Sequence, residues 1–102
     1  MSKSMIKLKI KEDKKSICLE GISYFKESLK KYLIVEQKHI ILIVEELEKK
    51  IDRELIVDLD ITQKIREVMV KYSHNQAFLR EEFEILIKVL SGHVEQNENI
   101  NW

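Results

Sequence analysis

LIVEQKHIILIVEELEKKIDR, residues 33 to 53, is the longest stretch of this 102-residue chain whose apolar residues keep the period of an α-helix. Four of them, spaced four, three and four residues apart, fall on one stripe: Ile40, Val44, Leu47 and Ile51. Most residues on the opposite side are charged, which is typical of a helix with one buried and one solvated face. Apolar residues at positions 41 to 43 widen the apolar face, so the stretch predicts a helix at the centre of the fold.

The composition predicts a compact protein built mainly of helices. Hydrophobic residues make up 44% of the chain and charged residues 35%, and two glycines and no proline leave few places for long irregular loops. We expect one domain over residues 1–92 and a flexible C-terminal tail over residues 93–102, where the sequence is polar and unpatterned. Eighteen basic residues balance eighteen acidic ones, so no overall field directs the chain to nucleic acid or to an anionic membrane.

Two stretches alternate between apolar and charged residues, which is the pattern of a half-buried strand. They are residues 5 to 11, MIKLKIK, and residues 54 to 61, ELIVDLDI. If the two strands pair, Lys7 and Lys9 are expected to face Asp58 and Asp60 across the ladder and form opposite-charge pairs. The sequence does not distinguish parallel from antiparallel pairing.

Residues 16 to 20, SICLE, allow two interpretations. Ile17 and Leu19 alternate with other residues ahead of Gly21, which favours a second strand that forms a hairpin with the first. The competing interpretation is a helix from residue 16 whose stripe begins with Cys18 and Ile22. That helix contains Gly21, at a cost of about 1 kcal/mol relative to alanine. We favour a strand that ends at Gly21 and is followed by a helix.

The remaining helical periodicity covers residues 22 to 33, 63 to 72 and 76 to 90. Thr62 or Asp60 is expected to cap the second of these helices, and Ser91 with Gly92 is expected to end the third.

The predicted fold class is helix-rich α+β, with a small two- or three-stranded sheet from residues 5 to 20 and 54 to 61 packed by about four helices. The alternative is an all-α antiparallel four-helix bundle with an N-terminal extension. In size, charge balance and helical content, such a bundle resembles the immunity proteins that protect bacteria from their own bacteriocins. The resemblance implies an inhibitor that acts by binding another protein.

No set of residues has the spacing of a catalytic or metal site. The three histidines, His39, His74 and His93, do not form an HExxH motif, paired cysteines are absent, and the two glycines stand too far apart for a phosphate-binding loop. Cys18 lies between aliphatic residues and is interpreted as a small buried hydrophobe. We therefore expect a protein that is not an enzyme and that uses no cofactor, metal or small-molecule substrate.

Residues 76 to 90 carry more apolar side chains than one helix face needs in a small domain. We interpret the surplus as a protein-binding surface, with Phe78, Ile85, Val89 and the C-terminal Trp102 as candidate contacts. Burial of this helix between two neighbours in the same monomer is an equally good explanation. The predicted function is a non-catalytic protein-binding module of regulatory, inhibitor or immunity type, from a bacterium, phage or other mobile element. Its partner is another protein or a second copy in a homodimer.

The alternative function is a nucleic-acid-associated factor. Its phosphate contacts come from the basic N-terminal strand and the residues after it: Lys7, Lys9, Lys11, Lys14 and Lys15. The competing interpretation is a charged strand face that protects an exposed sheet edge from aggregation. The chain has one cysteine and no secretory apolar segment near residue 1, and its longest aliphatic run is residues 40 to 44. That run is too short to span a bilayer, so we expect a cytoplasmic protein without membrane association.

Overall fold

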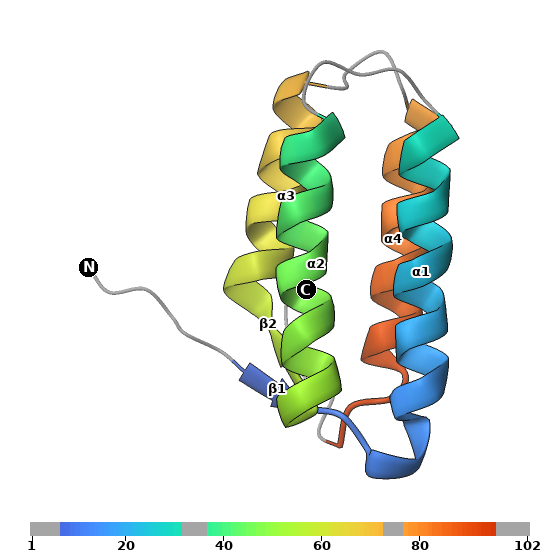
Figure 1. Ribbon diagram of the computed structural model, residues 1–102, viewed down its shortest axis with the longest axis vertical. Helices are drawn as coiled ribbons and strands as arrows, with labels where there is room; N and C mark the ends of the chain where they lie inside the picture. Colours follow the sequence, from blue (N-terminus) through green and yellow to red (C-terminus); the bar gives the residue numbers. More distant parts are fainter. Residues whose placement is uncertain (1–6, 32–36, 73–76, 96–102) are drawn as a thin grey trace, which may run out of the picture.

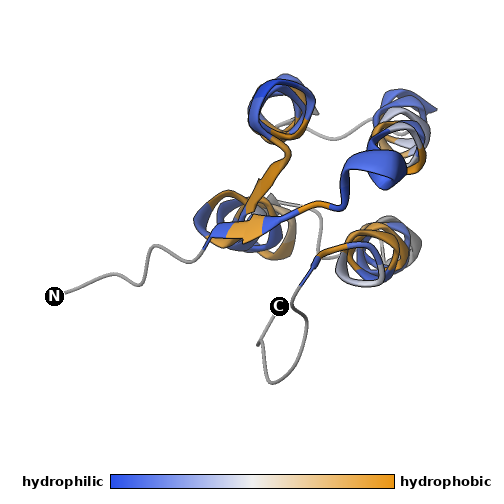
Figure 2. Cartoon of the chain, turned by 90° about the horizontal axis from the view of Figure 1, so that it is seen from below, coloured by the Kyte–Doolittle hydropathy of each residue, from blue (hydrophilic) through white to orange (hydrophobic). Residues whose placement is uncertain are grey.

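Four α-helices make up most of the part of the chain that the structure describes. The computed structural model describes residues 7–31, 37–72 and 77–95, except for the side chains of residues 37, 72 and 77–79. The helices are α1 (Lys15–Lys31), α2 (Gln37–Glu54), α3 (Leu59–Tyr72) and α4 (Ala77–Ser91). Consecutive helices run in opposite directions, and α1 and α3 each pack against α2 and α4 (Figure 1). Seen along the bundle, the four helices occupy the corners of a square (Figure 2).

The helix predicted within residues 33 to 53 is confirmed as α2, but it occupies one corner of the bundle and contacts α1 and α3, so its predicted central position is wrong (Figure 2). Ile40, Val44, Leu47 and Ile51 are each completely buried, because the spacing of the stripe matches one face of the helix. The predicted helix-rich α+β fold is also confirmed, since a small sheet accompanies the helices. The helices adopt the antiparallel bundle arrangement of the alternative prediction. None of the described helices is both long enough and apolar enough to cross a bilayer.

The small sheet closes one end of the bundle. Strand β1 (Lys7–Lys9) pairs antiparallel with β2 (Ile56–Asp58), and Leu8 lies opposite Val57. A short 3-10 helix, η1 (Glu12–Lys14), then leads from β1 into α1 (Figure 1). The alternation in residues 5 to 11 therefore predicted a strand correctly, but of the described residues the strand covers only Lys7–Lys9, with Ile10 in an isolated bridge.

Residues 93–95 cover the other edge of β1. Ile10 forms an antiparallel bridge with Val94, and the amide of Glu95 donates to the Lys9 carbonyl at 2.8 Å. The Val94 side chain is buried. Residues 93–95 of the predicted tail thus contact the sheet, and residues 96–102 lie outside the described part of the chain. The sequence gives no signal for this contact, because a single apolar residue in an otherwise polar segment forms no periodic pattern.

The predicted strand over residues 16 to 20 is wrong, because α1 begins at Lys15 and continues through Gly21. The competing helical stripe is the one observed, and Cys18, Ile22 and Phe25 are buried. Gly21 faces α4: a Cβ atom placed there lies 3.4 Å from a methyl carbon of Leu86. Tertiary packing between α1 and α4 thus outweighs the low helix propensity of glycine.

The predicted strand over residues 54 to 61 is longer than the observed β2, because α3 begins at Leu59. The register confirms the predicted pairing of Lys7 with Asp58, but Asp60 lies in the first turn of α3 and does not face Lys9. The cap of α3 is Asp58, not Thr62 or Asp60: its Oδ1 accepts a hydrogen bond from the Asp60 amide at 3.0 Å. The hydroxyl of Thr62 donates instead to the Leu59 carbonyl at 2.9 Å.

Leu55 forms the turn between α2 and β2. Its φ is 58°, in the left-handed region, and its amide donates to the Ile51 carbonyl at 3.0 Å. This is the hydrogen bond of a left-handed helix cap, a position where glycine is the usual residue. The Leu55 carbonyl accepts from the Ile10 amide at 2.7 Å, so the same turn aligns the sheet with the end of α2.

Candidate protein-binding surface

Helix α4 presents apolar side chains on two faces. Its inner face contributes four buried residues to the core: Phe83, Leu86, Ile87 and Leu90. Ile85 lies outside this stripe, and its side chain is 57% exposed. The phase of the inner stripe explains the exposure, because a residue two positions after Phe83 points to the far side of a helix.

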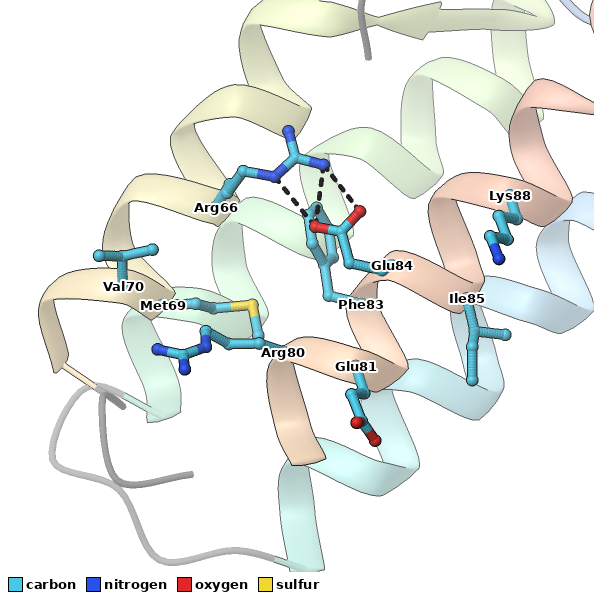
Figure 3. A pocket seen from close by; sticks show the side chains of 9 residues that line it. All are labelled: Arg66, Met69, Val70, Arg80, Glu81, Phe83, Glu84, Ile85 and Lys88. Carbon is cyan, nitrogen blue, oxygen red and sulfur yellow. Dashed lines mark hydrogen bonds and ion pairs between the residues drawn. The ribbon is translucent and has the colours of Figure 1, made fainter. Parts of the chain in front are cut away.

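A hollow of about 630 Å³ lies between α3 and α4 (Figure 3). The two core residues Met69 and Phe83 form its floor, and Val70 and Ile85 flank it as exposed apolar side chains. Val70 is 54% exposed. The hollow has a volume within the range of about 300–1,000 Å³ that ligand sites occupy, but α3 and α4 leave it open to solvent along their outer faces.

An ion pair ties the two walls of this hollow together. The Arg66 guanidinium of α3 donates from Nε and Nη2 to the two carboxylate oxygens of Glu84 in α4, both at 3.1 Å (Figure 3). The same guanidinium lies 5.4 Å from the centroid of the Phe83 ring. Phe83 in turn packs against Phe25 of α1, with 5.5 Å between ring centroids. The forked hydrogen bonds and the ring contact fix the position of this wall.

Three charged residues of α4 surround Ile85 on the solvent side. Arg80 is half-buried, whereas Glu81 and Lys88 are exposed (Figure 3). Among the described residues, none of the three forms an ion pair with another side chain.

A second, smaller hollow of about 290 Å³ lies on the other side of Ile85, between α1 and α4. Two residues of α1 flank it as exposed apolar side chains: Ile17, 42% exposed, and Tyr24, 64% exposed. Gly21 lines this smaller hollow between Ile17 and Tyr24, and its lack of a side chain leaves space there. One carboxylate oxygen of Glu82 is buried in this region without a hydrogen-bond partner among the described residues.

Two of the four predicted protein-binding residues, Ile85 and Val89, line this smaller hollow together. The side chain of Phe78 and all of Trp102 lie outside the described part of the chain. Sequence reasoning missed Tyr24 and Val70, together with Ile17. Each is an apolar residue that lies off the buried stripe of its own helix, and this off-stripe position was the available signal.

The lysines of the alternative prediction do not all lie together. Lys7 and Lys9 are exposed on the outer face of β1, and exposed Lys11 follows the strand two residues later. Lys14 is half-buried, and Lys15 forms an ion pair with Asp52 of α2 at 3.3 Å. Because residues 93–95 cover the second edge of β1, protection of a free sheet edge no longer explains these lysines.

The described residues contain no cluster of three or more histidine, cysteine, aspartate or glutamate side chains that could hold a metal. Cys18 is completely buried as predicted, and this burial raises the pKa of its thiol to about 11. His39 is exposed on α2, and His93 donates from Nδ1 to the Val89 carbonyl at 2.7 Å. His74 lies outside the described residues.

Comparison with models of known protein families, with curated proteins and with solved structures finds no match to this chain.

Proposed function

We propose that this chain is a non-catalytic protein-binding module of regulatory, inhibitor or immunity type, and that it binds its protein partner through the outer surface of α4. The observation that carries the proposal is the position of Ile85, an exposed apolar residue between two hollows. Exposed Val70 lies beyond one hollow, and exposed Ile17 and Tyr24 lie beyond the other. Exposed apolar side chains therefore lie on three neighbouring helices, around the two hollows.

Such a surface has the properties of a small interface centre. Burying the exposed part of an isoleucine side chain contributes about 1–2 kcal/mol, and a residue between two hollows can be surrounded completely by a partner. The charged residues Arg80, Glu81 and Lys88 lie around this apolar centre, as polar residues do at the rim of an interface. The arrangement supports reversible association with a protein better than binding of a small molecule, because both hollows are open.

The test compares Ile85→Asp with Leu42→Asp. Leu42 is the matched control because it is 66% exposed on α2 and lines neither of the two hollows. Neither substitution introduces a charge into the core, so both variants are expected to fold, which circular dichroism checks. Immobilised wild-type protein and both variants are incubated with an extract of the source organism at about 0.1 M and about 1 M salt. Retained proteins are identified and quantified by mass spectrometry, and self-association is measured in parallel.

We expect wild type and Leu42→Asp to retain one stoichiometric protein at both salt concentrations, or to self-associate, and Ile85→Asp to do neither. Equal binding by Ile85→Asp would show that the outer surface of α4 is not the interface. Recovery of nucleic acid alone, only at low salt and only with Lys7, Lys9 and Lys11 intact, would contradict the proposal and support the alternative function.

A further inference from the structure

Two exposed charges of opposite sign, Glu81 and Lys88, flank the exposed Ile85 along α4. Glu81, Ile85 and Lys88 are spaced four and three residues apart, so they lie on successive turns along one side of the helix (Figure 3). We call these three residues the outer stripe. All three residues of the outer stripe are exposed, whereas the residues on the inner face of α4 are buried.

This order of charges is complementary to itself when reversed. Along the helix axis, Glu81 lies about 6 Å to one side of Ile85 and Lys88 about 4.5 Å to the other. If a second α4 lies antiparallel with the two isoleucines in contact, each Glu81 therefore comes opposite a Lys88. The remaining offset of about 1.5 Å is well within the reach of a lysine side chain. A parallel arrangement would instead set like charges against each other.

We propose that the partner covering α4 is a second copy of this chain, bound antiparallel about a two-fold axis that passes beside Ile85. The inference rests on the proposed function, because it names the occupant of the same surface. A two-fold axis makes the interface isologous, so the single pairing of Glu81 with Lys88 occurs twice. An axis perpendicular to the helices also sets α1 against α1 and α3 against α3.

The neighbouring helices extend the contact beyond the outer stripe. In this arrangement, exposed Ile17 and Tyr24 of α1 face the same helix of the second copy, and so does exposed Val70 of α3. The two hollows beside Ile85 provide space for these side chains. An apolar centre with two symmetric ion pairs at its rim matches the anatomy of known protein interfaces. The ion pairs set the orientation, whereas the apolar contacts supply most of the affinity.

Charge reversal tests this arrangement directly. Sedimentation velocity is recorded for wild type, E81K, K88E and the double variant E81K/K88E between about 1 µM and about 1 mM protein. We expect the wild type to dimerise and each single variant to dimerise at least about tenfold more weakly, because each sets two pairs of like charges against each other. The double variant exchanges the two charges and is expected to recover most of the wild-type affinity.

The control is E46K, which reverses an exposed glutamate on α2 and changes the net charge by the same amount as E81K. It is expected to dimerise like the wild type, so a loss caused by net charge alone is separated from a loss of the pairing. Equal dimerisation of all variants, or failure of the double variant to recover, would overturn the proposed arrangement. A wild type that stays monomeric up to the highest concentration would overturn the second copy as the partner. In that case the capture experiment with Ile85→Asp still decides whether α4 binds a different protein.

Discussion

Replacing Leu55 by glycine is expected to give a more stable protein than replacing it by alanine, which is the reverse of the order within helices. Leu55 has a φ of 58° and caps α2 through the hydrogen bond from its amide to the Ile51 carbonyl. Both substitutions remove the same half-buried leucine side chain, so the loss of apolar contacts is nearly equal in the two variants. The difference between them reports the backbone conformation.

The magnitude follows from two opposing costs. A residue with a Cβ atom is destabilised by about 1–2 kcal/mol in the left-handed conformation, and alanine retains this cost. Glycine avoids it but loses about 0.5–1 kcal/mol more backbone entropy than alanine on folding. Leu55→Gly is therefore expected to exceed Leu55→Ala in unfolding free energy by about 0.5–1 kcal/mol.

Urea unfolding followed by circular dichroism measures the difference, with the midpoints compared at equal slope. Gly21→Ala is the internal control of opposite sign. Gly21 is inside α1, its φ is not positive, and the added Cβ meets Leu86 at an ordinary contact distance of 3.4 Å. Alanine at position 21 is expected to stabilise the protein by up to about 1 kcal/mol. A Leu55→Ala variant as stable as Leu55→Gly would refute the assignment of the left-handed cap.

Two further predictions concern side chains between helices. The Cys18 thiol, with a pKa of about 11, is expected to react with a thiol reagent at pH 8 at least about a hundredfold more slowly in the native protein than in urea, and equal rates would contradict its burial. Lys26 of α1 donates to Glu48 of α2 at 2.8 Å, and this hydrogen bond, strengthened by the charges of Glu48 and Glu45, raises the pKa of Lys26. Because the folded pKa is raised, the resulting stability is present below about pH 10.4 and is lost as pH rises through the folded pKa. Lys26→Met is therefore expected to be less stable than wild type by about 1 kcal/mol at pH 7. This difference in unfolding free energy is expected to narrow above about pH 10.4. A difference that does not depend on pH would argue against the ion pair.

Local periodicity predicted the elements whose pattern fits only one structure. The stripe of α2 has no strand-like alternative, and the lysine alternation around Leu8 has no helical one. Residues 16 to 20 fit both, and the choice depends on α4, whose Leu86 lies against Gly21. A contact between residues so far apart in sequence leaves no signal near Gly21, so the penalty for glycine in a helix pointed to the wrong structure.

The start of α3 illustrates a second limit. In ELIVDLDI, alternate residues are apolar and were assigned to one strand face, yet the chain changes from strand to helix after Asp58. Val57, Leu59 and Ile61 are all buried, so the pattern is compatible with either structure over so short a span. The change depends on the Asp58 carboxylate capping the Asp60 amide. Aspartate in an alternating pattern looks like a solvent-facing strand residue, and only the tertiary position of the turn reveals its capping role.

The candidate surface was predictable in its helix but not in its extent. The apolar surplus of α4 was visible in the sequence, whereas the contribution of Tyr24 and Val70 depends on which helices lie beside α4. Exposure alone is weak evidence of binding, because single exposed apolar residues such as Leu42 are common on monomers. Ile85 differs from Leu42 in its surroundings: it separates two hollows and lies between Glu81 and Lys88. Folding of the monomer does not need an isoleucine at position 85, since the core residues of α4 point the other way. In the proposed dimer, the second α4 contacts both this side chain and the charges beside it.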